Sequence, residues 1–169
     1  MQRILGIDPG LATLGYGVLD SDGSRVRHVA HGTFRTPSAD DIGPRLLAIH
    51  AELNRILILF QPDAAGVEQV FFARNVRSAI PVAQARGVVL MSLAAHAVSF
   101  GEYSPLQVKQ SILGRGNGRA DKSQMMNQVR LLFGLEAPPS TDHAADALAI
   151  AYCHLNYSQV TQILKAQLV

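Results

Sequence analysis

Cysteine is nearly absent from this 169-residue chain, which has one cysteine, Cys153, and no tryptophan. A single cysteine excludes intrachain disulfides and cysteine-rich zinc sites, and the apolar setting of Cys153 predicts a small buried side chain without a redox role. Long apolar runs are also missing, so nothing approaches the roughly 18 to 20 residues of a membrane span. The N-terminus lacks the basic and apolar regions of a signal peptide. These absences predict a cytoplasmic protein without a membrane segment.

The length and the composition together suit one domain. Hydrophobic residues make up 48% of the 169 residues, enough for a full core without stabilising crosslinks. We therefore expect a single domain over residues 1–169. Within it, about residues 158–169 form either a loose tail or a terminal helix.

The net charge of +2 conceals an uneven distribution of charged residues. Residues 74–130, called the basic segment below, carry eight Arg or Lys against two acids, a balance of +6. Residues 1–73 have six basic and eight acidic residues, and residues 131–169 have one basic and three acidic, so each end sums to −2. Arginine outnumbers lysine twelve to three, and its planar guanidinium suits phosphate. The pattern predicts a polyanion-binding surface beside acidic cation-binding ends, although a solvated helical face would give similar charges.

The first twenty residues place one acid at the end of a strand. Residues 3–7 are a short aliphatic run typical of a buried strand, Pro9-Gly10 can turn the chain, and residues 15–19 can return beside it. Asp8 then lies at the turn with no basic neighbour in the sequence. Because a buried carboxylate needs a partner, Asp8 is a candidate cation ligand. The alternative is an Asp that caps the Pro-Gly turn.

The remaining pattern alternates strands and helices and predicts an α/β fold with a mixed five-stranded sheet flanked by helices. Asp121 and Gln124 have the spacing of a capping box, which marks a helix start. Strands are expected at 25–34, 63–72 and 101–103, and helices with apolar positions from 46 to 60, at 77–99, 105–113, 121–133 and 142 to about 156.

Two further groups of residues carry candidate chemistry. Glu68 lies among apolar and amide residues in a predicted strand, where it either faces Asp8 or points outward from an edge. His143 and Asp146 are three residues apart on one face of an alanine-rich helix, so an oxygen and a nitrogen donor share that helix start. Asp142 is better explained as a first-turn partner of the helix dipole. His154 is expected to be an ordinary core or surface histidine.

Six short segments, taken in order, identify a family. They are Gly6 to Gly10, Val67 to Phe71, Gln84 to Gly87, Val108 to Gln110, Asp121 to Gln124 and His143 to Ala149. Each is weak alone, but together they resemble the RuvC crossover-junction endodeoxyribonucleases over about residues 2–157. The resemblance implies an RNase H-like fold and a homodimer that cuts four-way DNA junctions symmetrically after branch migration by RuvA and RuvB.

The same resemblance implies a metal site. By the match of motifs, Asp8, Glu68, His143 and Asp146 would be the catalytic residues and would hold two divalent cations, Mg²⁺ or Mn²⁺, about 4 Å apart. One ion would activate a water and the other would stabilise the leaving 3′ oxygen. Other RuvC-like sequences often carry a carboxylate where this chain has His143.

The resemblance also marks residues for contact with DNA. Phe71 would stack on a base at the opened junction, although a core position is an equal alternative. Lys109 and Lys122 match basic residues near the scissile phosphate. The backbone-tracking candidates are arginines of the basic segment, namely Arg74, Arg77, Arg115 and Arg119.

Three other functions share some of these sequence features. A sugar kinase or ATPase of the actin type needs a second phosphate-binding segment and a longer chain, and the glycine spacing of a Walker A loop is absent. A non-catalytic junction-binding module would have the basic segment but would not need Asp8, Glu68, His143 and Asp146. The presence of all four residues argues against it. A nuclease acting on another structured substrate, RNA–DNA hybrids included, remains open because a metal site alone does not select the nucleic acid.

Overall fold

One five-stranded sheet forms the centre of the molecule. The structure, a computed structural model, describes residues 1–69, 76–114 and 121–167, without the side chains of 76–78 and 159–167. The strands are β1 (Gln2–Asp8), β2 (Thr13–Ser21), β3 (Val26–Arg35), β4 (Ala64–Glu68) and β5 (Ser99–Tyr103). Their spatial order is β3-β2-β1-β4-β5. The predicted mixed five-stranded sheet is confirmed.

Strand pairing follows from the connections between the strands. β1, β2 and β3 are joined by short turns and pair antiparallel, as hairpins do. β4 pairs parallel to β1 after a helical crossover, and β5 pairs parallel to β4 after another. In the β1 and β4 register Ile7 lies beside Val67, so Asp8 and Glu68 follow at the same end of the sheet. This topology brings together two acids that are sixty residues apart.

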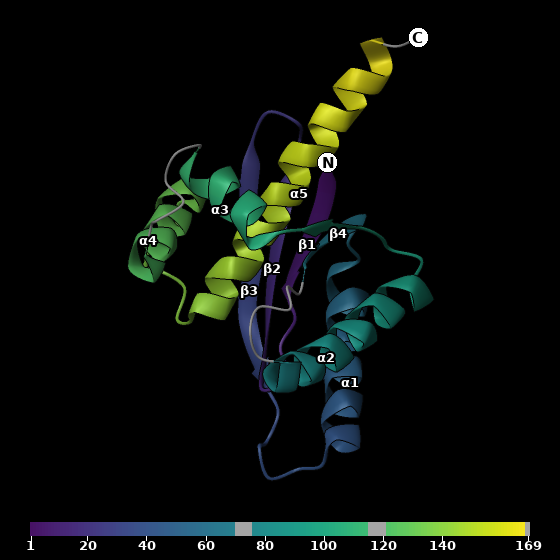
Figure 1. Ribbon diagram of the computed structural model, residues 1–169. Coiled ribbons are helices and arrows are strands. Elements are labelled where there is room, and N and C mark those ends of the chain that lie inside the picture. The colour runs from purple at the N-terminus through teal and green to yellow at the C-terminus, as the bar shows by residue number, and fades with distance from the viewer. Residues whose placement is uncertain (70–75, 115–120, 168–169) are drawn as a thin grey trace.

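Helices cover both faces of the sheet (Figure 1). On one face α1 (Ile42–Phe60) and α2 (Val76–Ala95) pack over the alternate β1 side chains Leu5 and Ile7. On the other face α5 (Asp142–Gln167) crosses β1 and β2, with α3 (Pro105–Leu113) and α4 (Lys122–Phe133) packed against it. A separate apolar cluster fills each side of the sheet. The two clusters hold the strands between fixed helices.

Close approach of α5 to the sheet depends on residues without large side chains. A Cβ at Gly6 would collide with the backbone of Ala147, and one at Gly15 would collide with the backbone of His143. On the helix side, five alanines between residues 144 and 151 are fully buried. Since the backbones meet almost directly, the first turn of α5 is held against the end of β1. The glycines near Asp8 therefore position a helix as well as a turn.

Two helix ends differ from the prediction. α2 was expected to reach Ser99, but it ends at Ala95, and Ala97 takes a left-handed φ of 54° before β5 begins at Ser99. α5 was expected to end near Asn156 and continues to Gln167, because residues 157–167 contain no glycine or proline to stop it. Of the two alternatives for residues 158–169, a loose tail or a terminal helix, the structure shows helix as far as Gln167. The predicted strand at 63–72 is described only to Gln69, of which Ala64–Glu68 is strand.

The predicted capping box is confirmed at the start of α4. The Asp121 carboxylate accepts from the Gln124 backbone N–H at 2.8 Å, and the Gln124 side chain accepts from the Asp121 N–H at 3.2 Å. Both bonds satisfy donors that the first helical turn leaves unpaired. α4 therefore starts at a defined residue, Lys122, beside α5.

The opposite end of the sheet is held by an ion pair. Arg3 Nε and Nη2 donate to the two Asp20 carboxylate oxygens at 2.7 and 2.8 Å, and Arg3 Nη1 donates to the Phe60 carbonyl at 3.0 Å. The pKa of Asp20 is lowered mainly by this hydrogen bond from Arg3. Both charged groups of the pair therefore have hydrogen-bond partners within the protein.

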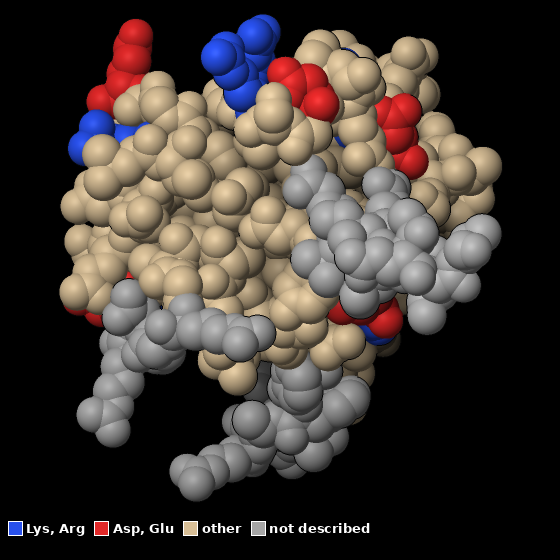
Figure 2. Space-filling view, turned by 90° about the horizontal axis from the view of Figure 1, so that it is seen from above, with Lys and Arg blue, Asp and Glu red and all other residues tan. Residues whose placement is uncertain are grey.

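The charges on the surface at this end are scattered. Figure 2 looks down on the end where the N-terminus lies, and its visible described surface is mostly uncharged, with Lys and Arg near the margins. A continuous basic surface is not seen among the described residues there.

Among the described residues, none of the helices has the length and apolarity needed to span a membrane.

Candidate active site

Asp8 and His143 form the centre of the site. Asp8 ends β1 with 9% of its surface exposed, and His143 lies in the first turn of α5. His143 Nδ1 lies 2.6 Å from Asp8 Oδ2. An ionised carboxylate only accepts, so Nδ1 carries the proton of this bond, and in the neutral imidazole Nε2 has the free lone pair. The pKa of His143 is raised, first by this hydrogen bond to Asp8.

Glu68 joins the site from β4. It is the last residue of that strand and pairs in register with Tyr103 of β5. Tyr103 forms a 3.0 Å hydrogen bond with His154 of α5. Residues in register on neighbouring parallel strands point to the same face of a sheet, so Glu68 also points toward α5. The pKa of Glu68 is raised to about 7, chiefly by burial and then by the charges of Asp8 and Asp146. Raised pKa values from burial and like charges are typical of catalytic carboxylates.

Asp146 approaches the same acids from α5. It lies one helical turn after His143, as the spacing predicted. Burial raises its pKa to about 6, with further contributions from the charges of Asp8 and Asp142. The structure thus brings β1, β4 and α5 together so that all four predicted residues interact.

The donor set fits a divalent cation. Among the described residues no three His, Cys, Asp or Glu side chains form a ready-made metal cluster, and His143 bonds to Asp8 instead. The pKa values of Glu68 and Asp146 are raised by burial and then by neighbouring acid charges, which include that of Asp8 for both, so three carboxyl groups are close enough to repel one another. Carboxylates are the usual ligands of Mg²⁺ and Mn²⁺, and a cation there would relieve their repulsion.

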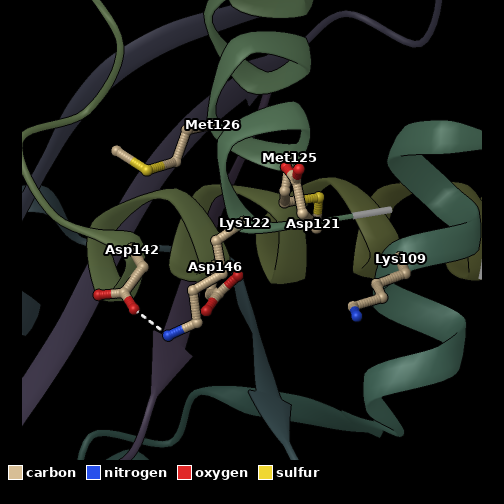
Figure 3. A pocket seen from close by; sticks show the side chains of 7 residues that line it. All are labelled: Lys109, Asp121, Lys122, Met125, Met126, Asp142 and Asp146. Atoms are coloured by element: carbon tan, nitrogen blue, oxygen red, sulfur yellow. Dashed lines mark hydrogen bonds and ion pairs between the residues drawn. The ribbon is translucent and has the colours of Figure 1, made fainter. Parts of the chain in front are cut away.

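A pocket of about 360 Å³ lies beside Asp146, between α3, α4 and α5 (Figure 3). Lys109 enters from α3 and Lys122 from α4, so both predicted lysines are at the site. Lys109 contributes a favourable charge to Glu68, and Lys122 contributes one to Asp146. The pocket therefore combines acids that can hold a cation with ammonium groups that can hold a phosphate.

The partner of Asp142 lies far from it in the sequence and was not predicted. The Asp142 carboxylate forms an ion pair with Lys122 Nζ, and this pair is drawn at the edge of the pocket in Figure 3. The hydrogen bond from Lys122 lowers the pKa of Asp142. Asp142 also occupies the first turn of α5, as expected for a helix-dipole partner. No local signal could have found the pair, because twenty residues and a loop separate the two.

Two further expectations concern buried residues away from the acids. Cys153 is fully buried, and burial raises the pKa of its thiol to about 11, which agrees with an inert core residue. His154 is also buried and hydrogen-bonds Tyr103, so of the two expected alternatives, core or surface, it is a core histidine.

Most of the other predicted DNA contacts fall outside the description. Phe71, Arg74, Arg115 and Arg119 lie outside the described residues. Arg77 lies within the backbone of α2, but its side chain is outside the description. Their contacts with DNA stay predictions.

Residues 4–154 match the family model for crossover junction endodeoxyribonuclease RuvC. The chain belongs to the RuvC family. RuvC of Syntrophomonas wolfei is 44% identical over 165 residues, covering 98% of this chain and 95% of the relative. RuvC of Rubrobacter xylanophilus is 49% identical over 153 residues, covering 90% and 84%.

A solved RuvC structure gives the same fold. Thermus thermophilus RuvC in complex with a Holliday junction substrate matches with a TM-score of 0.84 and 33% identity, covering 94% of this chain and 96% of that one. The RNase H-like fold expected from the motifs is confirmed, and the chain is a nuclease of a family in which divalent-metal dependence is typical.

Proposed function

We propose that this chain resolves four-way DNA junctions by metal-dependent hydrolysis of phosphodiester bonds. The supporting observation is the meeting of Asp8, Glu68 and Asp146, with His143, at one end of the sheet in a RuvC-family chain. The Thermus relative was solved with a Holliday junction, and its fold matches over 94% of this chain. Substrate and chemistry therefore both point to junction resolution.

Asp8, Glu68, His143 and Asp146 would hold two divalent cations, Mg²⁺ or Mn²⁺. Such ions, when bound, supply an activated water and stabilise charge on the oxygens of the reacting phosphate. The chain's own part is to hold the acids close together and directed at one place. β1 and β4 fix two of them by parallel pairing, and α5 fixes the others by close packing on Gly6 and Gly15.

The lysines have a different task. Lys109 and Lys122 line the pocket beside Asp146 and can attract the DNA phosphate toward the acids. Lysine acts as a point charge with three donors, so it can follow a phosphate as the junction settles. The predicted stacking by Phe71 and the backbone contacts of Arg74, Arg77, Arg115 and Arg119 belong to the same proposal.

Paired cutting would need two copies of the chain. A four-way junction has near-twofold symmetry, so a homodimer can present equivalent sites to strands of like polarity. We propose that this homodimer acts in the cytoplasm after RuvA and RuvB have moved the junction. Its surface is predicted to include the 77–99 segment, which contains most of α2.

Three substrates distinguish this proposal from its rivals. The purified chain is incubated with a synthetic four-way junction, a matched linear duplex and an RNA–DNA hybrid, each with Mg²⁺, Mn²⁺ or chelator. Paired symmetric nicks only in the junction, and only with metal, are expected. Junction binding without nicks would favour a non-catalytic binding module, and faster cutting of the hybrid would favour a nuclease for another substrate.

A further inference from the structure

Lys122 and Asp142 form an ion pair that joins the first residues of two helices. Lys122 begins α4 and Asp142 begins α5, and their side chains meet at the edge of the pocket (Figure 3). The Lys122 side chain is 80% exposed and that of Asp142 is 33% exposed. An ion pair this exposed contributes little to stability.

The two helices are already held together without this pair. α4 starts at the Asp121 and Gln124 capping box, and Met125, Val129 and Phe133 bury its inner face in the cluster shared with α5. The ion pair therefore adds little to the fold. What it does determine is the place of one ammonium group, which it keeps at the edge of the pocket beside Asp146.

The two lysines of the pocket are positioned in different ways. Lys109 is half-buried on α3, and among the described residues no ion pair within 4 Å is found for it, so its charge interaction with Glu68 acts over a longer distance. Lys122 is more exposed, and four rotatable bonds would spread its ammonium over many positions. Asp142 is the group that restricts it.

We propose that Asp142 is a positioning residue that holds Lys122 over the pocket and yields it to the DNA phosphate during cutting. This inference rests on the proposed junction-cutting function. Asp142 has two opposing effects on the reaction. It orders Lys122, which favours cleavage, and its negative charge opposes the incoming phosphate and competes for the same ammonium, which disfavours binding.

The opposing effects predict a split between binding and cleavage. In Asp142→Asn the oxygen that accepts from the His143 N–H is kept and the charge is lost. We expect the variant to bind the junction about two- to fivefold more tightly, yet to cleave it about tenfold more slowly in single turnover. A residue that only stabilises the start of α5 would change the melting temperature and would not move binding and cleavage in opposite directions.

The test uses the full chain with a four-way junction, and measures the dissociation constant in chelator and the single-turnover rate with Mn²⁺. The variants are Asp142→Asn, Asp142→Glu, Lys122→Met and the double variant Asp142→Asn with Lys122→Met. Asp142→Glu keeps the negative charge at this position, so that variant should cut within about threefold of wild type. In the Lys122→Met background, Asp142→Asn should lower the rate no further. Glu52→Gln, which breaks the exposed pair with Arg55 on α1, is the matched control and should change neither quantity.

Each contrary outcome has a distinct meaning. An Asp142→Asn rate within twofold of wild type overturns the inference. A tenfold loss that persists in the Lys122→Met background also overturns it, because Asp142 would then act directly on the site. An equal loss of cleavage rate in Asp142→Glu and Asp142→Asn also overturns the inference, because the shape of the side chain and not its charge would then matter. A wild type that nicks no junction overturns the proposed function, and this inference with it.

Discussion

A buried acid lies at each end of β1, and the two acids have different hydrogen-bond partners. At the start of the strand, Arg3 donates twice to Asp20 of the neighbouring β2, and the Phe60 carbonyl takes a third guanidinium donor. At the other end, Asp8 has only the imidazole of His143 as a hydrogen-bond partner among the described side chains. The exposed fractions of Asp20 and Asp8 are nearly equal, at 8% and 9%, so burial alone does not separate them.

The difference lies in the partner charge. Arg3 is always protonated, so the Asp20 end is neutral within the protein itself. Near Asp8, the acids Glu68 and Asp146 add negative charge, and their pKa values are raised to about 7 and about 6. Asp20 is hydrogen-bonded to a permanent cation and stabilises the fold, whereas acids that repel one another can take a cation from solution. The difference can be tested by substitutions at either end of β1.

The largest effect is expected from Asp8→Asn. The amide keeps the shape of the carboxylate but loses the charge that would hold a divalent ion, so cleavage should fall by about a thousandfold or more. Junction binding should stay close to wild type. Single-turnover cleavage and fluorescence anisotropy measure the two. Residual cleavage within about tenfold of wild type would remove Asp8 from the centre of the site.

His143 should show a smaller and metal-dependent effect. Imidazole is a softer ligand than carboxylate, so wild type should favour Mn²⁺ over Mg²⁺. His143→Asp should remain active and shift its preference toward Mg²⁺, while His143→Ala should lose about ten- to a hundredfold in cleavage. Rates are measured over a concentration series of each ion. Equal activity of His143→Ala and wild type with both ions would make His143 a structural residue.

Asp20→Asn should affect stability instead of cleavage. Removing one partner of the Arg3 pair should lower the free energy of unfolding by about 1–3 kcal/mol at pH 7. Arg3 lowers the folded pKa of Asp20, so this contribution is complete above the unfolded pKa of about 3.9 and is lost as the pH falls through the folded value. The gap between wild type and variant should therefore narrow near pH 3.

Urea unfolding at both pH values measures this gap, and Glu52→Gln is the control because the Arg55 side chain of that pair is 54% exposed, against 35% for Arg3. Cleavage per folded Asp20→Asn molecule should match wild type. A thousandfold loss of cleavage in folded Asp20→Asn would contradict the distinction between the two ends.

Lys122→Ala should give the smallest effect. It removes one ammonium from the pocket edge, so junction binding should weaken several-fold and the slope of log affinity against log salt should fall by about one. Titrations at four salt concentrations measure the slope. Arg55→Ala on α1 is the control, since Arg55 also has a carboxylate partner, Glu52, but does not line the pocket. An unchanged slope would mean that Lys122 is an ordinary solvated surface residue that makes no phosphate contact.

Much of the site could be predicted because its residues sit in informative local surroundings. Asp8 and Glu68 each end an apolar strand, and His143 and Asp146 share a helix face, so charge in an apolar setting marked all four. The ion pairs could not be predicted in the same way. Arg3 and Asp20 are seventeen residues apart, and Lys122 and Asp142 are twenty, so their contacts depend on strand register and helix packing. The helix ends at Ala95 and Gln167 were also missed, because end positions depend on weak local preferences.

The sequence by itself determined the alternation of strands and helices, the capping box at Asp121 and the ordered motifs of the RuvC family, because each depends on residues close together in the chain. Only the tertiary structure decided that Asp8 meets His143 across 135 residues and that Asp142 holds Lys122. Glycines at positions 6 and 15 allow α5 to lie almost directly on β1 and β2. That close packing converts separate acids into one charged site, since electrostatic coupling depends on distance in space and not on distance along the chain.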